Sequence, residues 1–182
     1  MIVGAESRKA GEQMKRYLVL FLLPAILTWN AAEGSENLDR HIKPEYHFDR
    51  LWLEEGLSQS SVRALHQDSR GFLWIGTEDG LNKYDGYSFK VYKSESDNRN
   101  SLGSNFIRVI HESPEGVLWI GTNGGGLTRF DIEREQFARY QSAGGLSGSI
   151  SNNYVWDIYE DENGIFWIGT DGGGLNRFNP VT

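Results

Sequence analysis

The tetrapeptide Trp74-Ile75-Gly76-Thr77 occurs again as Trp119-Ile120-Gly121-Thr122 and as Trp167-Ile168-Gly169-Thr170. The three tryptophans are separated by 45 and 48 residues, and aliphatic residues lie 17 and 12 positions before each of them. A repeat of this length that carries a recurrent tryptophan is typical of β-propellers, in which each unit forms one blade. The repeat therefore predicts an all-β fold.

Each repeat unit predicts one blade, a four-stranded antiparallel meander. Runs of β-branched and aromatic residues supply the strands, and segments such as Asp68–Gly71 predict type I turns closed by a glycine with positive φ. The first strands are expected at Val62–Gln67, Ile107–Glu112 and Val155–Glu160, the second at Phe72–Thr77 and its equivalents, the third ending at Tyr84, Phe130 and Phe178, and the fourth at Ser88–Tyr92 and Phe137–Tyr140.

The second strand of each unit is apolar almost throughout, which predicts burial on both faces between stacked blades. We therefore expect Trp74, Trp119 and Trp167 to be the packing residues between blades. The glycine-rich segments that follow, such as Asn123–Gly126, are expected to be hairpin turns. Phosphate-binding glycine loops precede a helix, whereas a strand follows here.

The N-terminal region predicts export from the cytoplasm. Tyr17–Trp29 is an uncharged apolar run directly after Lys15-Arg16, and small residues follow it. This pattern is typical of a secretory signal peptide, and the run is too short to span a membrane; a buried core segment is the alternative. We expect a signal peptide at 1–34, with Met14 as a candidate start, and a linker at 35–45. No membrane span is expected in the exported part.

The repeats are expected to fill residues 46–182, as units at 57–101, 102–149 and 150–182, with 46–53 as a lone outer strand. These units amount to about three blades. A closed propeller has roughly four to eight blades. We therefore expect an incomplete propeller whose partners are missing blades or other copies of the chain.

These units resemble the two-component regulator propeller repeat family. The resemblance rests on the three Trp-Ile-Gly-Thr elements followed by Gly-Leu-x-x-aromatic, as in Gly174-Leu175-Asn176-Arg177-Phe178. It implies the N-terminal part of a periplasmic sensor in a protein anchored in the inner membrane. Output would come from a downstream histidine kinase or diguanylate cyclase. Two alternatives are a secreted scaffold that oligomerises into a ring and a fragment of a propeller enzyme.

Composition and local patterns argue against catalysis and nucleic-acid binding. The net charge of −7 disfavours nucleic acid, and the absence of cysteine excludes thiol chemistry. His66 and His111 share one repeat position, where the third unit has Tyr159, so a structural role is expected. Glu160–Gly164 lacks the ligand spacing of a calcium loop. We expect no catalytic, cofactor or metal residues, hence no enzyme.

Antiparallel meanders place two kinds of connection on one face of a propeller: the turns between second and third strands, and the loops between units. That face gathers Glu78, Asp79, Asn123 and Asp171 with the loops Ser94–Asn105 and Gln141–Asn153. Polar loops on a rigid scaffold are a usual place for recognition. We predict that these four residues mark a face that binds a carbohydrate or another small ligand, since acidic and amide groups suit sugars or cations.

Overall fold

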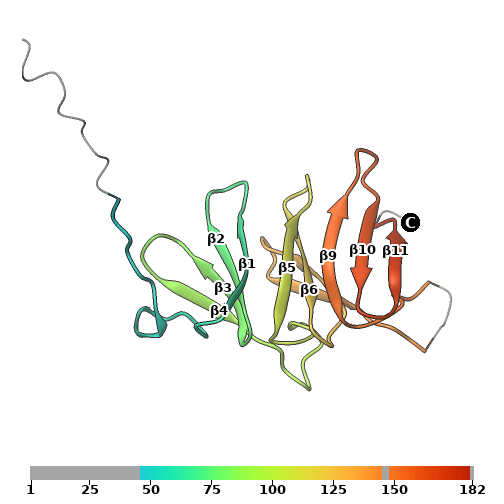
Figure 1. The fold of residues 1–182 in the computed structure, drawn as a ribbon, viewed down its shortest axis with the longest axis horizontal. Coiled ribbons are helices and arrows are strands. Elements are labelled where there is room, and N and C mark those ends of the chain that lie inside the picture. The colour runs from blue at the N-terminus through green and yellow to red at the C-terminus, as the bar shows by residue number, and fades with distance from the viewer. Residues whose placement is uncertain (1–45, 145–147, 181–182) are drawn as a thin grey trace, which may run out of the picture. The chain divides into compact units, whose positions relative to one another are not determined.

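The structure is a computed structural model that describes residues 46–144 and 148–180 (Figure 1). The expected signal peptide and linker lie outside the described residues. The chain divides into two compact units, Met1–Phe48 and Asp49–Thr182, and all described strands lie in the second. Within the described residues, no helix is long and apolar enough to cross a membrane.

The second unit is all-β and consists of three antiparallel sheets, each a propeller blade (Figure 1). Blade 1 contains β1 (Val62–Gln67), β2 (Leu73–Thr77), β3 (Gly80–Tyr84) and β4 (Phe89–Tyr92). Blade 2 contains β5 (Ile107–Glu112), β6 (Val117–Thr122), β7 (Leu127–Asp131) and β8 (Gln136–Tyr140). Blade 3 contains β9 (Val155–Glu160), β10 (Phe166–Thr170) and β11 (Gly174–Phe178). The predicted class is confirmed, and the described blades do not form a closed propeller.

The strand register repeats from blade to blade. In blade 1, Trp74 of β2 stands opposite His66 of β1 and Lys83 of β3. The same positions align in blade 2 around Trp119 and in blade 3 around Trp167. The predicted second, third and fourth strands match the observed ones to within one or two residues. The predicted first strands match β1, β5 and β9 in full.

The turn between the first and second strands has the predicted conformation. Gly71, Gly116 and Gly164 have φ of 90°, 74° and 71°, a region that favours glycine. The amide of Gly71 donates to the carbonyl of Asp68 at 2.8 Å, which closes the turn. The same bond recurs in the other two units at 2.9 Å.

Two hydrophobic clusters lie between neighbouring blades. Trp74 is fully buried, and its ring meets Phe130 of blade 2 edge-on at 5.7 Å. Trp119 meets Phe166 of blade 3 in the same way at 4.9 Å. Trp167, at the same repeat position in blade 3, is only partly buried. Aromatic rings and aliphatic side chains thus pack together between the blades.

The structure does not contain the lone outer strand that the sequence predicts at 46–53. Residues 46–52 have no regular structure, and a short 3₁₀ helix follows at Leu53–Glu55. A strand needs a partner to supply its backbone hydrogen bonds, and none of the described strands pairs with this segment. Blade 3 accordingly has three described strands instead of four.

Candidate functional site

The structure brings the turns between second and third strands next to the loops that join blades. The amide of Gly80, at the β2–β3 turn, donates to the carbonyl of Asn105 at 2.8 Å. The amides of Gly124 and Gly126, at the β6–β7 turn, donate to the carbonyl of Asn153 at 3.1 and 2.9 Å. Each turn is therefore tied to the loop that leads into the next blade. We call this surface, formed by 78–79, 94–105, 123–125, 141–144, 148–153 and 171–173, the loop face.

Two asparagines hold the loops of this face in place. The side-chain oxygen of Asn105 accepts from the amide of Ser94 at 2.6 Å, and that of Asn153 accepts from the amide of Ser142 at 2.7 Å. Each asparagine therefore connects the last residues of its loop to the first ones. Such side-chain-to-backbone bonds replace the ladder bonds that loops lack.

Three of the four predicted site residues are already paired with neighbours. Glu78 accepts from Arg63 Nε at 2.9 Å, and Asn123 accepts from Arg108 at 3.2 Å. Asp79 forms an ion pair with Lys93 at 2.7 Å and accepts a hydrogen bond from Asn105 at 3.3 Å. These cations offset the acidic character that the sequence suggests. The carboxylate of Asp171 is exposed and has no hydrogen-bond partner among the described residues.

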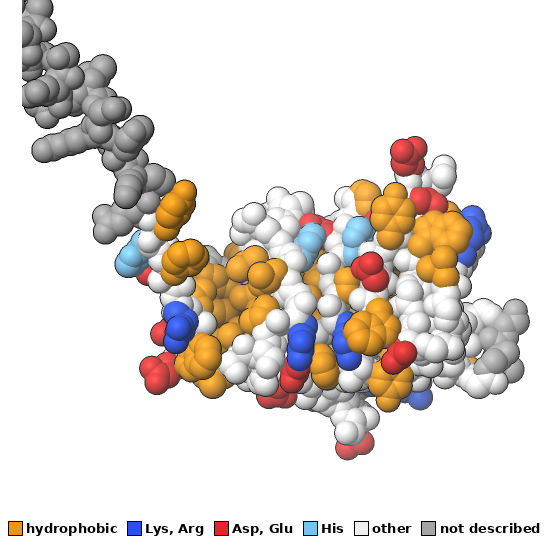
Figure 2. All heavy atoms as spheres, viewed as in Figure 1, with side chains coloured by type: hydrophobic (Ala, Val, Ile, Leu, Met, Phe, Trp, Pro, Cys, Tyr) orange, Lys and Arg blue, Asp and Glu red, His pale blue; other side chains and the backbone are white. Residues whose placement is uncertain are grey.

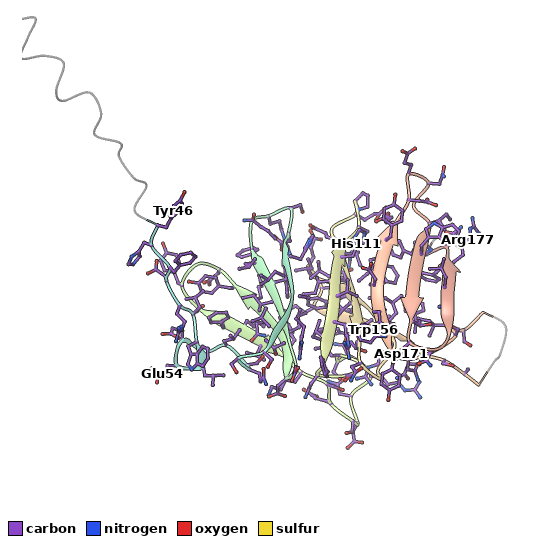
Figure 3. The ribbon with its side chains drawn as sticks, viewed as in Figure 1. Tyr46, Glu54, His111, Trp156, Asp171 and Arg177 are labelled. Atoms are coloured by element: carbon purple, nitrogen blue, oxygen red, sulfur yellow. The ribbon has the colours of Figure 1, made fainter. Side chains whose placement is uncertain are left out.

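An arginine and aromatic row, which the sequence analysis did not identify, runs across the starts of the first strands. The guanidinium of Arg108 lies 3.9 Å from the ring centroid of Trp156 and 4.8 Å from that of Phe106. Trp156 and Tyr154 are 50% and 46% exposed. Figure 3 shows Trp156 and Asp171 at the same end of blade 3. This end of blade 3 therefore offers open aromatic faces beside a carboxylate that no described side chain pairs with.

The sequence contains a pattern that predicts this row. Arg63, Arg108 and Trp156 each lie 11 residues before the tryptophan of their unit, so they share one repeat position. Equivalent positions on the first strands of successive blades lie side by side. Aligning exposed positions, as well as the apolar ones, predicts the row.

The two repeated histidines each pair with a glutamate of the following blade. His66 Nε2 lies 3.3 Å from Glu112, and His111 Nε2 lies 2.7 Å from Glu160. Within the described residues, no group of three or more His, Cys, Asp or Glu side chains is arranged to hold a metal ion. The contacts of the histidines are those of a structural link between blades.

The acidic segment Glu160–Gly164 forms the end of β9 and the β9–β10 turn. Asp161 accepts from Trp167 Nε1 at 3.0 Å and from the amides of Asn163 and Ile165. The hydrogen bond from Trp167 holds the pKa of Asp161 below its ordinary value. The carboxylate thus organises its own turn.

A hollow of about 580 Å³ lies beside β11, lined by residues that include Tyr140, Arg177 and Phe178. In blades 1 and 2 the corresponding edge of the third strand is occupied by β4 and β8. The hollow therefore lies where a fourth strand of blade 3 would pair. We interpret it as an unfilled strand position rather than a ligand pocket.

Stacked four-stranded antiparallel blades with a shared Trp-Ile-Gly-Thr strand define the class of β-propellers. Residues 56–79, 101–124 and 149–172 match the family described as two component regulator propeller. The chain contains three repeats of that family, and the predicted resemblance is confirmed.

Similar proteins include a histidine kinase and the extracellular domains of hybrid two component systems. A 48-residue stretch is 52% identical to Histidine kinase P4 of Formosa agariphila, covering 26% of this chain and 4% of that protein. The extracellular domain of the hybrid two component system BT3049 of B. thetaiotaomicron is 31% identical with a TM-score of 0.63, over 74% of this chain and 20% of that one. The corresponding domain of BT4673 is 32% identical with a TM-score of 0.56, over 66% and 16%. This chain thus spans a fifth or less of the length of these relatives.

Proposed function

We propose that this chain is part of a non-catalytic sensor that recognises a small ligand outside the cytoplasm. The observation that carries the proposal is the 31% identity, at a TM-score of 0.63, to the extracellular domain of a hybrid two component system. The three family repeats support the same assignment. In the longer protein, the signal would pass to a histidine kinase or a diguanylate cyclase. A signal peptide within residues 1–34 would direct export to the periplasm.

The loop face at blade 3 has the chemistry for a ligand such as a carbohydrate. Trp156 and Tyr154 present half-exposed rings, which can pack against the apolar face of a sugar ring. The exposed carboxylate of Asp171 can accept hydrogen bonds from ligand hydroxyl groups. Arg108 is held against the indole of Trp156, which fixes the orientation of that ring. Trp156 lies in β9, and Tyr154 and Asp171 directly adjoin β9 and β10, so little ordering is needed on binding.

Binding measurements on the purified chain test this proposal. We would titrate panels of neutral and acidic oligosaccharides and follow heat and tryptophan fluorescence. The expected result is saturable binding that Trp156→Ala weakens at least tenfold and Asp171→Asn weakens less. Tyr87→Ala is the matched control, because Tyr87 is 96% exposed in the β3–β4 hairpin, away from the loop face. Failure of every ligand to bind, or equal binding by Trp156→Ala, would contradict the assigned site.

The output of the longer protein needs a separate test. Sequencing the gene beyond the codon for Thr182 is expected to reveal further repeats, a membrane helix and a kinase or cyclase domain. A stop codon directly after Thr182 would contradict output from the same polypeptide. It would leave the ligand measurement unaffected.

A further inference from the structure

Two repeat positions on the loop face carry different charges in the three blades. One lies on the first strand, 11 residues before the tryptophan of its unit, and the other lies 4 residues after that tryptophan, in the turn between the second and third strands. The two positions hold Arg63 and Glu78 in blade 1, Arg108 and Asn123 in blade 2, and Trp156 and Asp171 in blade 3. Only blade 1 therefore has both a cation and a carboxylate.

The positive charge is compensated in blade 1 and uncompensated in blade 2. Arg63 Nε donates to Glu78 at 2.9 Å, and a second nitrogen of the same guanidinium contacts the same carboxylate. Arg108 instead donates to the side-chain oxygen of Asn123 at 3.2 Å. An amide oxygen has no formal charge, so this hydrogen bond leaves the cation unneutralised. The arginine ion pairs among the described residues are those of Arg63, Arg70 and Arg134.

Aromatic rings hold the guanidinium of Arg108 and leave most of its N–H groups free. The guanidinium lies 3.9 Å from the ring centroid of Trp156 and 4.8 Å from that of Phe106. Stacking of this kind engages the flat face of a guanidinium and keeps its N–H donors at the edge. The hydrogen bond to Asn123 is the one that the described residues take from this edge. The other donors match the paired oxygens of an acidic group, with which arginine forms parallel hydrogen bonds.

The surroundings of Arg108 are complete on both sides, because blade 2 packs against blade 1 and against blade 3. The side chain of Arg108 is partly exposed, and Trp156 beside it is 50% exposed. Figure 2 shows basic side chains next to hydrophobic ones near the ends of the blades where β5 and β9 begin. A ligand can therefore reach the guanidinium from solvent while it contacts an open indole ring.

We propose that the ligand of the loop face is an acidic saccharide whose carboxylate or sulfate group binds Arg108. This inference rests on the proposed recognition function and adds the charge of the ligand to it. The sugar ring packs on Trp156, and hydroxyl groups of the same saccharide donate to Asp171. Blades 2 and 3 thus present uncompensated charges of opposite sign. These charges orient the saccharide, because its acidic group is attracted to Arg108 and repelled by Asp171.

Calorimetric titration of the purified chain with matched pairs of saccharides tests the proposal. The probes are oligosaccharides of galacturonic, glucuronic and mannuronic acid, each with its carboxyl-reduced neutral form, and a sulfated galactan oligosaccharide with its desulfated form. We expect an acidic probe to bind about tenfold tighter than its neutral form, the effect of hydrogen bonds to a charged group. This preference should decrease as sodium chloride is added. Whether the carboxylated or the sulfated probes bind tighter identifies the acidic group.

Two substitutions remove the charge of this site in different ways. Arg108→Gln deletes the cation, whereas Asn123→Glu reproduces the self-compensated pair of blade 1 with Arg108 still in place. Each is expected to abolish the preference for the acidic form and to leave binding of the neutral form unchanged. Arg134→Gln is the matched control, because it removes an equal charge at the other end of β7 and should leave the preference intact. Urea unfolding verifies that each variant is folded.

The possible outcomes distinguish this inference from the proposed function. Equal binding of acidic and neutral forms, both weakened by Trp156→Ala, would leave the recognition function standing and overturn the acidic class of ligand. A preference that survives both Arg108→Gln and Asn123→Glu would overturn the role of Arg108. Binding of none of the probes would contradict the recognition site itself, and the acidic class with it.

Discussion

At the residue scale, the glycine of Trp-Ile-Gly-Thr is required for space and not for backbone conformation. Gly71 has a positive φ, whereas Gly76, Gly121 and Gly169 have ordinary strand conformations. The neighbouring blade approaches Gly76 and Gly121 so closely that a methyl group would overlap it. Overpacking of this kind forces shifts of backbone and side chains.

Alanine substitution at these glycines should therefore give different results in different units. We expect Gly76→Ala to lower the free energy of unfolding by about 1–3 kcal/mol, because the new methyl group meets Ile107. Gly169→Ala meets nothing, so the free energy of unfolding should stay unchanged or rise by up to about 1 kcal/mol through the unfolded chain. Urea unfolding followed by tryptophan fluorescence measures both. Equal losses in the two variants would show that the glycine acts through the backbone.

The pairing of Asp68 with Trp74 is the second feature at this scale. Trp74 Nε1 donates to the buried carboxylate at 2.9 Å, and the amides of Arg70 and Phe72 donate to its other oxygen. Burial raises the pKa of Asp68, but these hydrogen bonds outweigh it, so the pKa lies below its ordinary value of 3.8. Unit 2 has Ser113 at this position, and unit 3 repeats the aspartate as Asp161.

The lowered pKa predicts a dependence of stability on pH. Because the folded-state pKa of Asp68 is lower than the unfolded one, its stabilisation is complete above the unfolded value and is lost as pH falls through the folded value. Asp68→Asn should lower the free energy of unfolding by about 2 kcal/mol at neutral pH, which is within the range for hydrogen bonds to a charged group. The destabilisation should become smaller as pH falls from 3.8 through the lower folded-state pKa of Asp68. Urea unfolding from pH 7 to 2 measures this difference, with the exposed Asp97→Asn as control. An equal loss of unfolding free energy across that pH range would contradict a contribution from the ionised carboxylate of Asp68.

At the element scale, local sequence patterns predict the strands and turns. The features that they do not predict depend on contacts between residues far apart in the sequence. Repeat alignment and turn residues placed β1, β5 and β9 correctly, because each strand and its turn lie within a few residues. The segment 46–52 has strand-like residues, but none of the described strands pairs with it, and its sequence alone does not reveal this. The pairing of Glu78 and Asp79 with cations also depends on side chains from other elements. Sequence therefore located the loop face, but not which of its carboxylates are free.

The loop 94–105 depends on one arginine of a distant strand. Arg139 of β8 donates to the carbonyls of Ser101 and Asn98 at 2.9 and 2.8 Å, and also contacts the hydroxyl of Ser101. Phe137 on the same strand donates its amide to Asn100 at 2.7 Å. The loop is thus attached to the outer strand of blade 2. Polar loops held in this way keep a fixed shape without a core of their own.

Arg139→Met should release this loop while leaving the blades folded. We expect the free energy of unfolding to fall by about 1–2 kcal/mol, since carbonyl groups lose a charged donor but regain water. Hydrogen exchange of the amides of 94–105 should accelerate by tenfold or more. Arg134→Met is the matched control, because Arg134 is an exposed cation of the β7–β8 turn that pairs only locally with Asp131. Unchanged exchange in the loop would indicate that Asn105 and Ser101 hold it without Arg139.

At the scale of the whole second unit, the three blades differ in how much of their surface is covered. Blade 2 packs against a neighbour on both faces, and β6 is buried along almost its full length. Blade 3 has one neighbour, and β11 is mostly exposed. In stacked repeats, stability is approximately the sum of each unit and its contacts with neighbours. The middle blade should therefore be the most stable.

Native-state hydrogen exchange measures this gradient directly. Amides of β6 should exchange only through global unfolding, whereas those of β10 and β11 should exchange through local opening at lower free energy. Equal protection in all three blades would mean that the unit opens as one cooperative block. Contacts between neighbouring blades would then not set its local stability.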